Sequence, residues 1–213
     1  MIEVIFDIET MNLFGDNGAT QPVDLGVSVV SAYRREVDKV GNEIRGEMKS
    51  FWDKGAKNID GGELGFSNLW TWFKEADRII GFNSLGFDVP ALAPVFAPDN
   101  LFGLPHFDIL EKVRNVLGHR LSLNAIAKET LGYSKIDDGL NAVAYWRSQK
   151  PEDMSKLRKY CEMDVVVTTD VYKYALKNGK LRYKDKWNEL REVEVDFAYP
   201  KVFVPTELQM GLF

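Results

Sequence analysis

The sequence predicts a mixed α/β fold, in which a sheet packs against helices. Three observations lead to this prediction. Segments rich in β-branched and aromatic residues come early in the chain, helical periodicity dominates the second half, and strand and helix patterns alternate between them. The chain has 213 residues, which is enough for one sizeable domain with a short extension.

The strands are expected mainly in the first half of the chain. Short apolar or β-branched runs predict four strands, at residues 4–6, 24–33, 46–52 and 78–83. The first three follow one another as a meander, separated by a loop over residues 11–22 and a polar turn around Gly41. Between the third and fourth strands, Leu, Trp and Phe recur at helical spacing over residues 64–76, which predicts a helix.

The second half of the chain is expected to be helical. A helix should begin near Pro90 and run to about Phe96, since proline is favoured in a first helical turn. Apolar periodicity predicts four further helices, at residues 109–117, 123–131, 140–148 and 151–177. Beyond Gly179, apolar residues alternate with charged ones, which predicts a C-terminal β-hairpin turning at Trp187 and Asn188. The expected organisation is a main domain over residues 1–178, a hairpin extension over 179–199 and an extended tail over 200–213.

Composition narrows the class of protein. The chain is 45% hydrophobic and 28% charged, with a formal net charge of -5 and a pI near 5.2, so any nucleic-acid contact must be local or metal-assisted. The single cysteine, Cys161, excludes an internal disulfide and a cysteine-rich zinc site. No apolar run approaches the roughly 20 residues of a membrane span, and the N-terminus lacks a signal-peptide pattern. We therefore expect a cytoplasmic protein without a membrane partner.

Two acids end the first predicted strand. Asp7 and Glu9 are two residues apart, and alternation along a strand places both side chains on the same face. Neighbouring carboxylates repel each other unless a cation or a shared proton lies between them. The pair therefore indicates a divalent-metal site, although a strand end that simply meets solvent has the same pattern.

Further acids are placed where they could reach the same point. Asp88 follows the strand at 78–83, where it either caps the next helix or joins the acidic pair. Tyr160 and Asp164 are four residues apart in the long helix and share one face. Asp164 lies within an apolar stripe, and burial of its charge costs free energy unless the carboxylate binds a metal or pairs with a basic side chain.

These three segments resemble the three sequence motifs of the DEDD superfamily of 3'-5' exonucleases. Residues 6–10 resemble its Asp-x-Glu motif, residues 81–88 its Asn motif with an aromatic–Asp pair, and residues 160–164 its Tyr-x3-Asp motif. The motifs occur in the family's order over residues 2–178. The sister group carries His five residues before the last Asp, where this chain has Lys159, so the resemblance is to the Tyr-type branch.

The resemblance implies an RNase H-like fold, with a mixed sheet flanked by helices, and a two-metal-ion mechanism. The four acids would bind two Mg²⁺ or Mn²⁺ ions, and they are Asp7, Glu9, Asp88 and Asp164. Tyr160 would orient the attacking water, because an unperturbed tyrosine has a pKa of about 10 and stays protonated. Residues beside the motifs would bind the 3' end of a single-stranded DNA or RNA, and they are Thr10, Asn83 and Phe87. The products would be 5'-nucleoside monophosphates, in DNA repair, replication or RNA processing.

Two rival functions remain open at this point. A structure-specific endonuclease on the same fold would use the same acids. A non-catalytic module that binds nucleic acid or a sliding clamp would keep the fold alone. Calorimetric titration with Mg²⁺ separates a catalytic site from such a module, and a circular substrate separates an endonuclease from an exonuclease.

Several other side chains have a structural and a functional interpretation. The basic residues at 173–186 are expected to form a solvated helix end and hairpin face, with a phosphate-binding ridge as the alternative. His119 and Arg120 are expected at the surface, with a nucleic-acid contact as the minor alternative. Asp108 is expected to cap a helix, and Glu162 to face solvent. Three aromatic residues are candidates for a base-stacking wedge or for core packing, and they are Phe14, Phe82 and Phe87.

The last five residues resemble the short peptide by which bacterial DNA-processing enzymes bind the sliding clamp. That peptide has a Gln followed by an apolar residue and ends in Leu-Phe, and the matching residues here are Gln209, Leu212 and Phe213. The alternative is a tail that folds back on its own domain. Deletion of residues 209–213 should weaken co-elution with a clamp.

Overall fold

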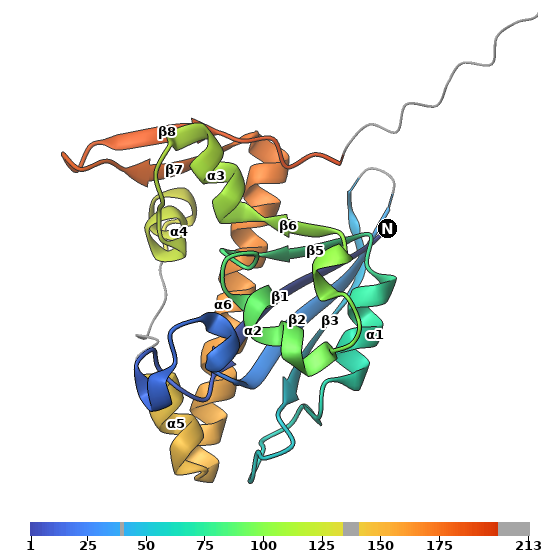
Figure 1. Cartoon of the computed structure of the whole chain (residues 1–213). Coiled ribbons are helices and arrows are strands. Elements are labelled where there is room, and N and C mark those ends of the chain that lie inside the picture. Colours follow the sequence, from blue (N-terminus) through green and yellow to red (C-terminus); the bar gives the residue numbers. More distant parts are fainter. Residues whose placement is uncertain (39–40, 134–140, 200–213) are drawn as a thin grey trace, which may run out of the picture.

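Six strands form one mixed sheet in the computed structural model, which describes residues 1–38, 41–133 and 141–199 (Figure 1). The strands, given in chain order, are β1 (Ile2–Thr10), β2 (Val27–Val37), β3 (Glu43–Trp52), β4 (Glu63–Leu64), β5 (Arg78–Gly81) and β6 (His106–Asp108). Their order across the sheet is β4-β3-β2-β1-β5-β6. β1 therefore lies inside the sheet, between β2 and β5.

β1 has two neighbours along its first half and one along its second. It pairs antiparallel with β2 over its whole length, from Ile2 opposite Glu36 to Thr10 opposite Val27. Its parallel pairing with β5 covers Glu3–Ile5 only. The end of β1, which carries Asp7 and Glu9, therefore extends past β5 toward the start of α2.

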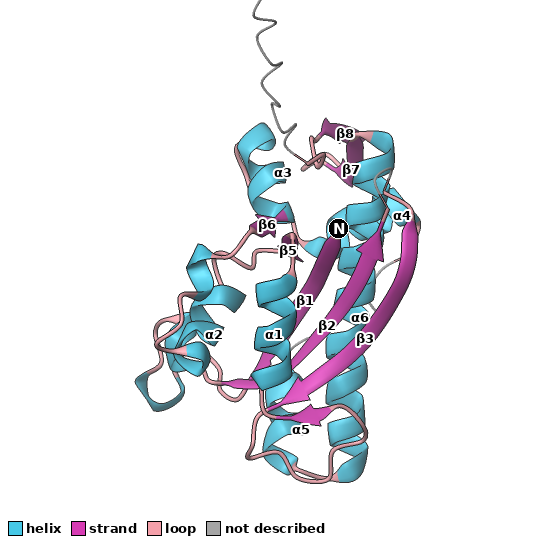
Figure 2. Ribbon diagram, turned by 90° about the vertical axis from the view of Figure 1, so that its right-hand side faces the viewer, coloured by secondary structure: helices cyan, strands magenta, loops and turns pink. Residues whose placement is uncertain are grey.

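Helices cover both faces of the sheet (Figure 2). The helices, in chain order, are α1 (Ser67–Glu75), α2 (Asp88–Phe96), α3 (Ile109–Leu117), α4 (Leu123–Leu131), α5 (Ala142–Ser148) and α6 (Pro151–Asn178). Three short 3-10 turns are η1 (Asp16–Gly18), η2 (Pro22–Asp24) and η3 (Leu101–Gly103). α1 and α2 pack on one face, and α6 runs across β1 and β2 on the other.

Alternation along β1 decides which side chains meet α6. Val4, Phe6 and Ile8 belong to the core that packs against α1 and α2. Ile5 belongs instead to the core that contains Val165 of α6. Because side chains alternate along a strand, the odd-numbered acids of β1 share the α6 side with Ile5.

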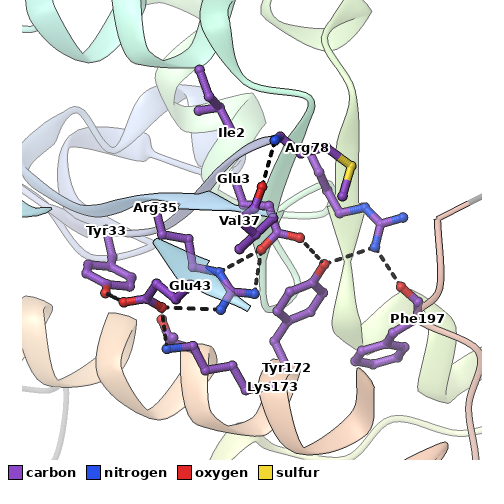
Figure 3. A network of polar contacts seen from close by, with 12 residues as sticks. Ile2, Glu3, Tyr33, Arg35, Val37, Glu43, Arg78, Tyr172, Lys173 and Phe197 are labelled. Carbon is purple, nitrogen blue, oxygen red and sulfur yellow. Dashed lines mark hydrogen bonds and ion pairs between the residues drawn. The ribbon is translucent and has the colours of Figure 1, made fainter. Parts of the chain in front are cut away.

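A buried polar network joins the start of β1 to α6 (Figure 3). The Glu3 carboxylate accepts hydrogen bonds from Arg35 Nε at 2.7 Å and from Tyr172 Oη at 2.7 Å. Arg78 Nη1 donates in turn to Tyr172 Oη at 2.9 Å and to the Phe197 carbonyl at 2.6 Å. The Glu3 and Arg35 side chains are 1% and 3% exposed. The network therefore holds β1, α6 and the segment after the hairpin in one arrangement.

The C-terminal hairpin consists of β7 (Lys180–Lys184) and β8 (Leu190–Glu194), which pair antiparallel. It packs on α4, where Thr130 Oγ1 accepts from the backbone N–H of Arg182 at 2.9 Å and donates to the Arg182 carbonyl at 3.1 Å. Asn188 adopts a left-handed conformation in the turn, with φ of 62°. The hairpin turns where the sequence predicted.

The structure confirms the predicted architecture, a mixed sheet flanked by helices with a C-terminal hairpin. Several bounds differ. β1, β2 and β3 are longer at one or both ends than the apolar runs that predicted them, and Leu64 lies in β4 rather than in α1. The tail at 200–213 lies outside the described residues, so the clamp hypothesis on Gln209, Leu212 and Phe213 stays a prediction. Within the described part of the chain, no helix is long and apolar enough to cross a membrane.

Candidate active site

Three carboxylates converge between β1 and α6. One ligand oxygen from each of Asp7, Glu9 and Asp164 lies within 4.8 Å of the others. Asp164 is buried, whereas Asp7 and Glu9 are half-buried. They meet because the odd-numbered side chains of β1 face the helix that carries Asp164. The first strand and the long helix, which the sequence analysis connected, therefore meet at these acids.

This donor set fits a divalent cation. The oxygens of Asp7, Glu9 and Asp164 come from carboxylates, which are the preferred ligands of Mg²⁺ and Mn²⁺ and poor ligands for thiolate-seeking metals. Three like charges within 4.8 Å of one another repel, and a cation between them removes that repulsion. The nearby thiol of Cys161 is buried, and its Sγ donates to the Asp7 carbonyl at 3.4 Å.

Asp88 interacts with this cluster from a different element, the helix α2. It is the first residue of α2, and Phe87 occupies the N-cap position without a side-chain hydrogen bond, so Asp88 does not cap the helix. Its carboxylate accepts a hydrogen bond from the backbone N–H of Ile8 and interacts electrostatically with Asp164. The Ile8 N–H is accessible because β1 runs past β5 at this point. Asp88 is outside the group of three acids whose oxygens lie within 4.8 Å of one another.

Burial strongly raises the pKa of the Asp88 carboxyl group. The side chain is 5% exposed, and desolvation, followed by the charge of Asp108, raises the pKa of Asp88 to about 7. Because this folded-state pKa exceeds the ordinary value of 3.8, protonation of Asp88 favours the folded state. The free energy of unfolding of the metal-free protein should therefore fall as the pH rises from about 4 to about 7.

Asp88→Asn should remove this loss of stability. In a chelator, we expect the variant to exceed the wild type in free energy of unfolding by a few kcal/mol at about pH 8, and by much less at about pH 5. Urea denaturation at the two pH values measures both differences. Glu152→Gln, which changes an exposed acid of α6, is the matched control. An equal effect of Asp88→Asn at both pH values would contradict the assignment.

Tyr160 lies one helical turn before Asp164 on α6 and is half-buried. Burial, followed by the charges of Asp164, Glu9 and Asp7, raises the pKa of Tyr160 far above its ordinary value. The phenol therefore stays protonated at neutral pH. Its protonated form can donate a hydrogen bond at the acidic cluster but cannot act as a general base.

Asp108 forms hydrogen bonds with the loop that precedes Asp88. As predicted, it caps α3, accepting from the backbone N–H of Leu110 at 2.9 Å and of Glu111 at 3.3 Å. It also accepts from the backbone N–H of Asn83 at 2.8 Å and of Leu85 at 3.0 Å. One carboxylate thus joins the start of α3 to the β5–α2 loop. The sequence indicated the cap but not this second role, for which no local pattern exists.

Of the predicted substrate-binding residues, Thr10 ends β1, and Asn83 and Phe87 lie in the loop between β5 and α2. Thr10 Oγ1 donates to the Asn12 carbonyl at 2.9 Å. Asn83 has a left-handed backbone, with φ of 64°, and its Oδ1 accepts from Arg120 Nη2 at 2.8 Å. The Phe87 ring lies edge-on to that of Phe14, with centroids 6.2 Å apart, and Phe14 is 56% exposed.

Two expectations about neighbouring residues have clear outcomes. Glu162 is less exposed than expected, since its side chain is 28% exposed and accepts from Ser50 Oγ at 2.9 Å. No pattern in the sequence of α6 indicates this long-range contact with β3. Phe82 packs against the α6 core, as the core-packing interpretation predicted.

Most of the basic residues after the third motif are paired with acids. Lys173 pairs with Glu43, Lys180 and Arg182 with Glu192, and Lys184 with Glu129. These contacts favour the solvated-face interpretation for that part of the cluster. Lys186 differs, because its Nζ lies 4.3 Å from the centroid of the Trp187 ring.

The fold and the site together define an α/β domain with a cluster of acids at the end of its central strand. The chain belongs to the RNase H superfamily, whose family model matches residues 4–176. Among solved structures it is similar to E. coli ExoI in a zinc-bound complex with single-stranded DNA, at 17% identity and a TM-score of 0.47. That match covers 83% of this chain and 41% of ExoI, so the chain spans less than half of the ExoI length. A comparison with curated proteins found no match.

Proposed function

We propose that the protein is a metal-dependent 3'-5' exonuclease of the Tyr-type DEDD class, which releases 5'-nucleoside monophosphates. The observation that carries the proposal is the convergence of Asp7, Glu9 and Asp164 within 4.8 Å, with Asp88 and Tyr160 beside them. Membership of the RNase H superfamily supports a nuclease on this fold. In this proposal, residues 1–178 form the catalytic domain and residues 179–199 an extension.

The four acids would hold two Mg²⁺ or Mn²⁺ ions. When bound, such ions lower the pKa of a water and stabilise the charge on the attacking and leaving oxygens. Asp7 and Glu9 contribute from the rigid central strand, and Asp164 from a buried helix position, so little reorganisation accompanies binding. Asp88 is held in place by the Ile8 N–H. Its raised pKa makes metal binding dependent on deprotonation near pH 7.

Tyr160 is assigned to orientation of the attacking water. Its protonated hydroxyl would donate a hydrogen bond to that water, near the carboxylates of Asp164, Glu9 and Asp7, whose charges raise the pKa of Tyr160. Phe14 and Phe87 would contact the terminal base, and Asn83 and Thr10 the sugar-phosphate backbone. An exposed aromatic ring such as that of Phe14 suits stacking without base-specific hydrogen bonds.

Tyr160→Phe tests the role of the hydroxyl. We expect the rate of hydrolysis to fall by about 10- to 100-fold, because the water loses its orienting donor, while the affinity for Mn²⁺ changes little. Rates come from single-turnover assays and affinity from calorimetry. Tyr174→Phe, a half-buried tyrosine further along α6, is the matched control. Unchanged turnover of Tyr160→Phe would show that another group orients the water.

The overall activity is tested with 5'-end-labelled strands of DNA and RNA, single and double, in Mg²⁺, Mn²⁺ or chelator. The proposal predicts a ladder that shortens from the 3' end only when metal is present, with release of mononucleotides. A circular strand and a 3'-blocked strand should both resist. Cutting of the circular strand would instead assign a structure-specific endonuclease, and binding without metal-dependent cutting would assign a non-catalytic module.

A further inference from the structure

An open groove lies between the α3–α4 connection and the C-terminal hairpin. Its volume is about 650 Å³, and its lining includes His119, Tyr183, Lys184, Lys186, Trp187 and Arg191. Asp185 also lines it and pairs with Arg191 at 2.8 Å. The turn of the hairpin projects on the same side of the molecule as α4 (Figure 1).

The groove combines aromatic rings with cations. The Trp187 side chain is 69% exposed at the hairpin turn, with Lys186 Nζ 4.3 Å from its centroid. His119 and Tyr183 lie edge-on to each other, with centroids 6.3 Å apart. Three of the lining residues are cationic, in a chain whose net charge is -5; Arg191 pairs with Asp185 and Glu189, Lys184 lies 3.9 Å from Glu129, and Lys186 lies over the Trp187 ring. An exposed tryptophan beside lysines is the pattern of a stacking platform with a polyanion contact.

The groove is connected to the loop that precedes Asp88. His119 lines the groove, and its neighbour Arg120 donates to Asn83 Oδ1 at 2.8 Å. Asn83 lies in the loop that leads to Asp88 and is held there by Asp108. The α3–α4 connection therefore touches the groove on one side and the site loop on the other.

The hairpin that carries Trp187 is anchored to the rest of the domain. Both backbone groups of Arg182 bond to Thr130 of α4, and the hairpin side chains Leu181, Tyr183 and Val193 belong to the core that contains α6. A rigid support lowers the part of the entropic cost of binding that comes from ordering the protein.

We propose that this groove binds single-stranded nucleic acid, at nucleotides remote from the 3' end that enters the acidic cluster. This proposal rests on the proposed function, because it assumes that the substrate is a polynucleotide. A base would stack on Trp187, while Lys186 contacts one phosphate and Lys184 exchanges its 3.9 Å contact with Glu129 for another. The same chemistry accommodates DNA and RNA, because every base has a stacking face.

The test measures binding in chelator, where no hydrolysis occurs. Fluorescence anisotropy with labelled DNA and RNA strands of about 20 nucleotides should show that Trp187→Ala lowers affinity by roughly 5- to 100-fold, as expected for one stacked base. Trp187→Phe should restore most of that affinity. Replacing Lys184 and Lys186 together by Ala should make the salt dependence less steep, by about two phosphate contacts. Phe102→Ala, which changes an exposed aromatic of η3, should bind like the wild type.

Strand length gives a second readout. The ratio of affinities for strands of about 20 and about 4 nucleotides should fall in Trp187→Ala, because a short strand in the site does not reach the groove. Wild-type affinity in Trp187→Ala for both DNA and RNA would overturn the proposal, even where Asp164-dependent hydrolysis is found. Trp187-dependent binding without any hydrolysis would support the groove and refute the exonuclease proposal instead.

Discussion

Asp7→Asn and Asp164→Asn are each expected to lower metal-dependent hydrolysis by about 1,000-fold or more. Each substitution keeps the shape of the side chain and removes one of three carboxylates whose oxygens lie within 4.8 Å of one another. The rate is measured on a 3'-end substrate, and Mn²⁺ binding by calorimetry. Affinity for Mn²⁺ should fall together with the rate, because the same oxygens serve both.

The stability of these variants distinguishes a lost site from a lost fold. We expect their free energy of unfolding in chelator to match or exceed that of the wild type, since a repelling charge has been removed. Glu162→Gln is the matched control, because Glu162 lies two residues from Asp164 on α6 but pairs with Ser50. Full activity of Asp7→Asn would refute the site, and a similar loss in Glu162→Gln would indicate general damage to the helix.

Glu3→Ala is expected to lower the free energy of unfolding by about 3–5 kcal/mol. Glu3 accepts hydrogen bonds from Arg35 and Tyr172, and a third from Tyr199 Oη at 2.9 Å. Its removal leaves the Arg35 guanidinium, which is 3% exposed, without its nearest carboxylate. Breaking a buried pair costs far more than the pair itself contributes, because the remaining charge stays desolvated. Urea denaturation measures the difference.

Glu36→Ala provides the comparison for this prediction. Glu36 pairs with Arg45 at 2.8 Å, but the Arg45 side chain is 68% exposed, so the loss should be about 1 kcal/mol or less. Comparable losses in Glu3→Ala and Glu36→Ala would show that the Figure 3 network does not hold the fold together. Glu3→Gln should lie between Glu3→Ala and the wild type, because the amide retains an acceptor but loses the charge.

Short-range patterns predicted much of this molecule correctly. The cap at Asp108 and the helix end at Gly179 lie where the sequence indicates them, because capping depends on a few adjacent residues. The hairpin turn follows from alternation and turn chemistry, which are equally local. The proposal that Asp7, Glu9 and Asp164 lie together came from motif resemblance and from face arguments on one strand and one helix.

The sequence by itself determined the fold class, the positions of the acids along the chain and the face on which each projects, since these depend on periodicity and neighbouring residues. The tertiary structure alone decided that β1 runs past β5 and presents the Ile8 N–H to Asp88, which burial brings to a pKa of about 7. It also decided the pairing of Glu162 with Ser50 and the groove beside Trp187. These features depend on contacts between residues far apart in the chain, and no local pattern encodes the distance at which two such segments pack.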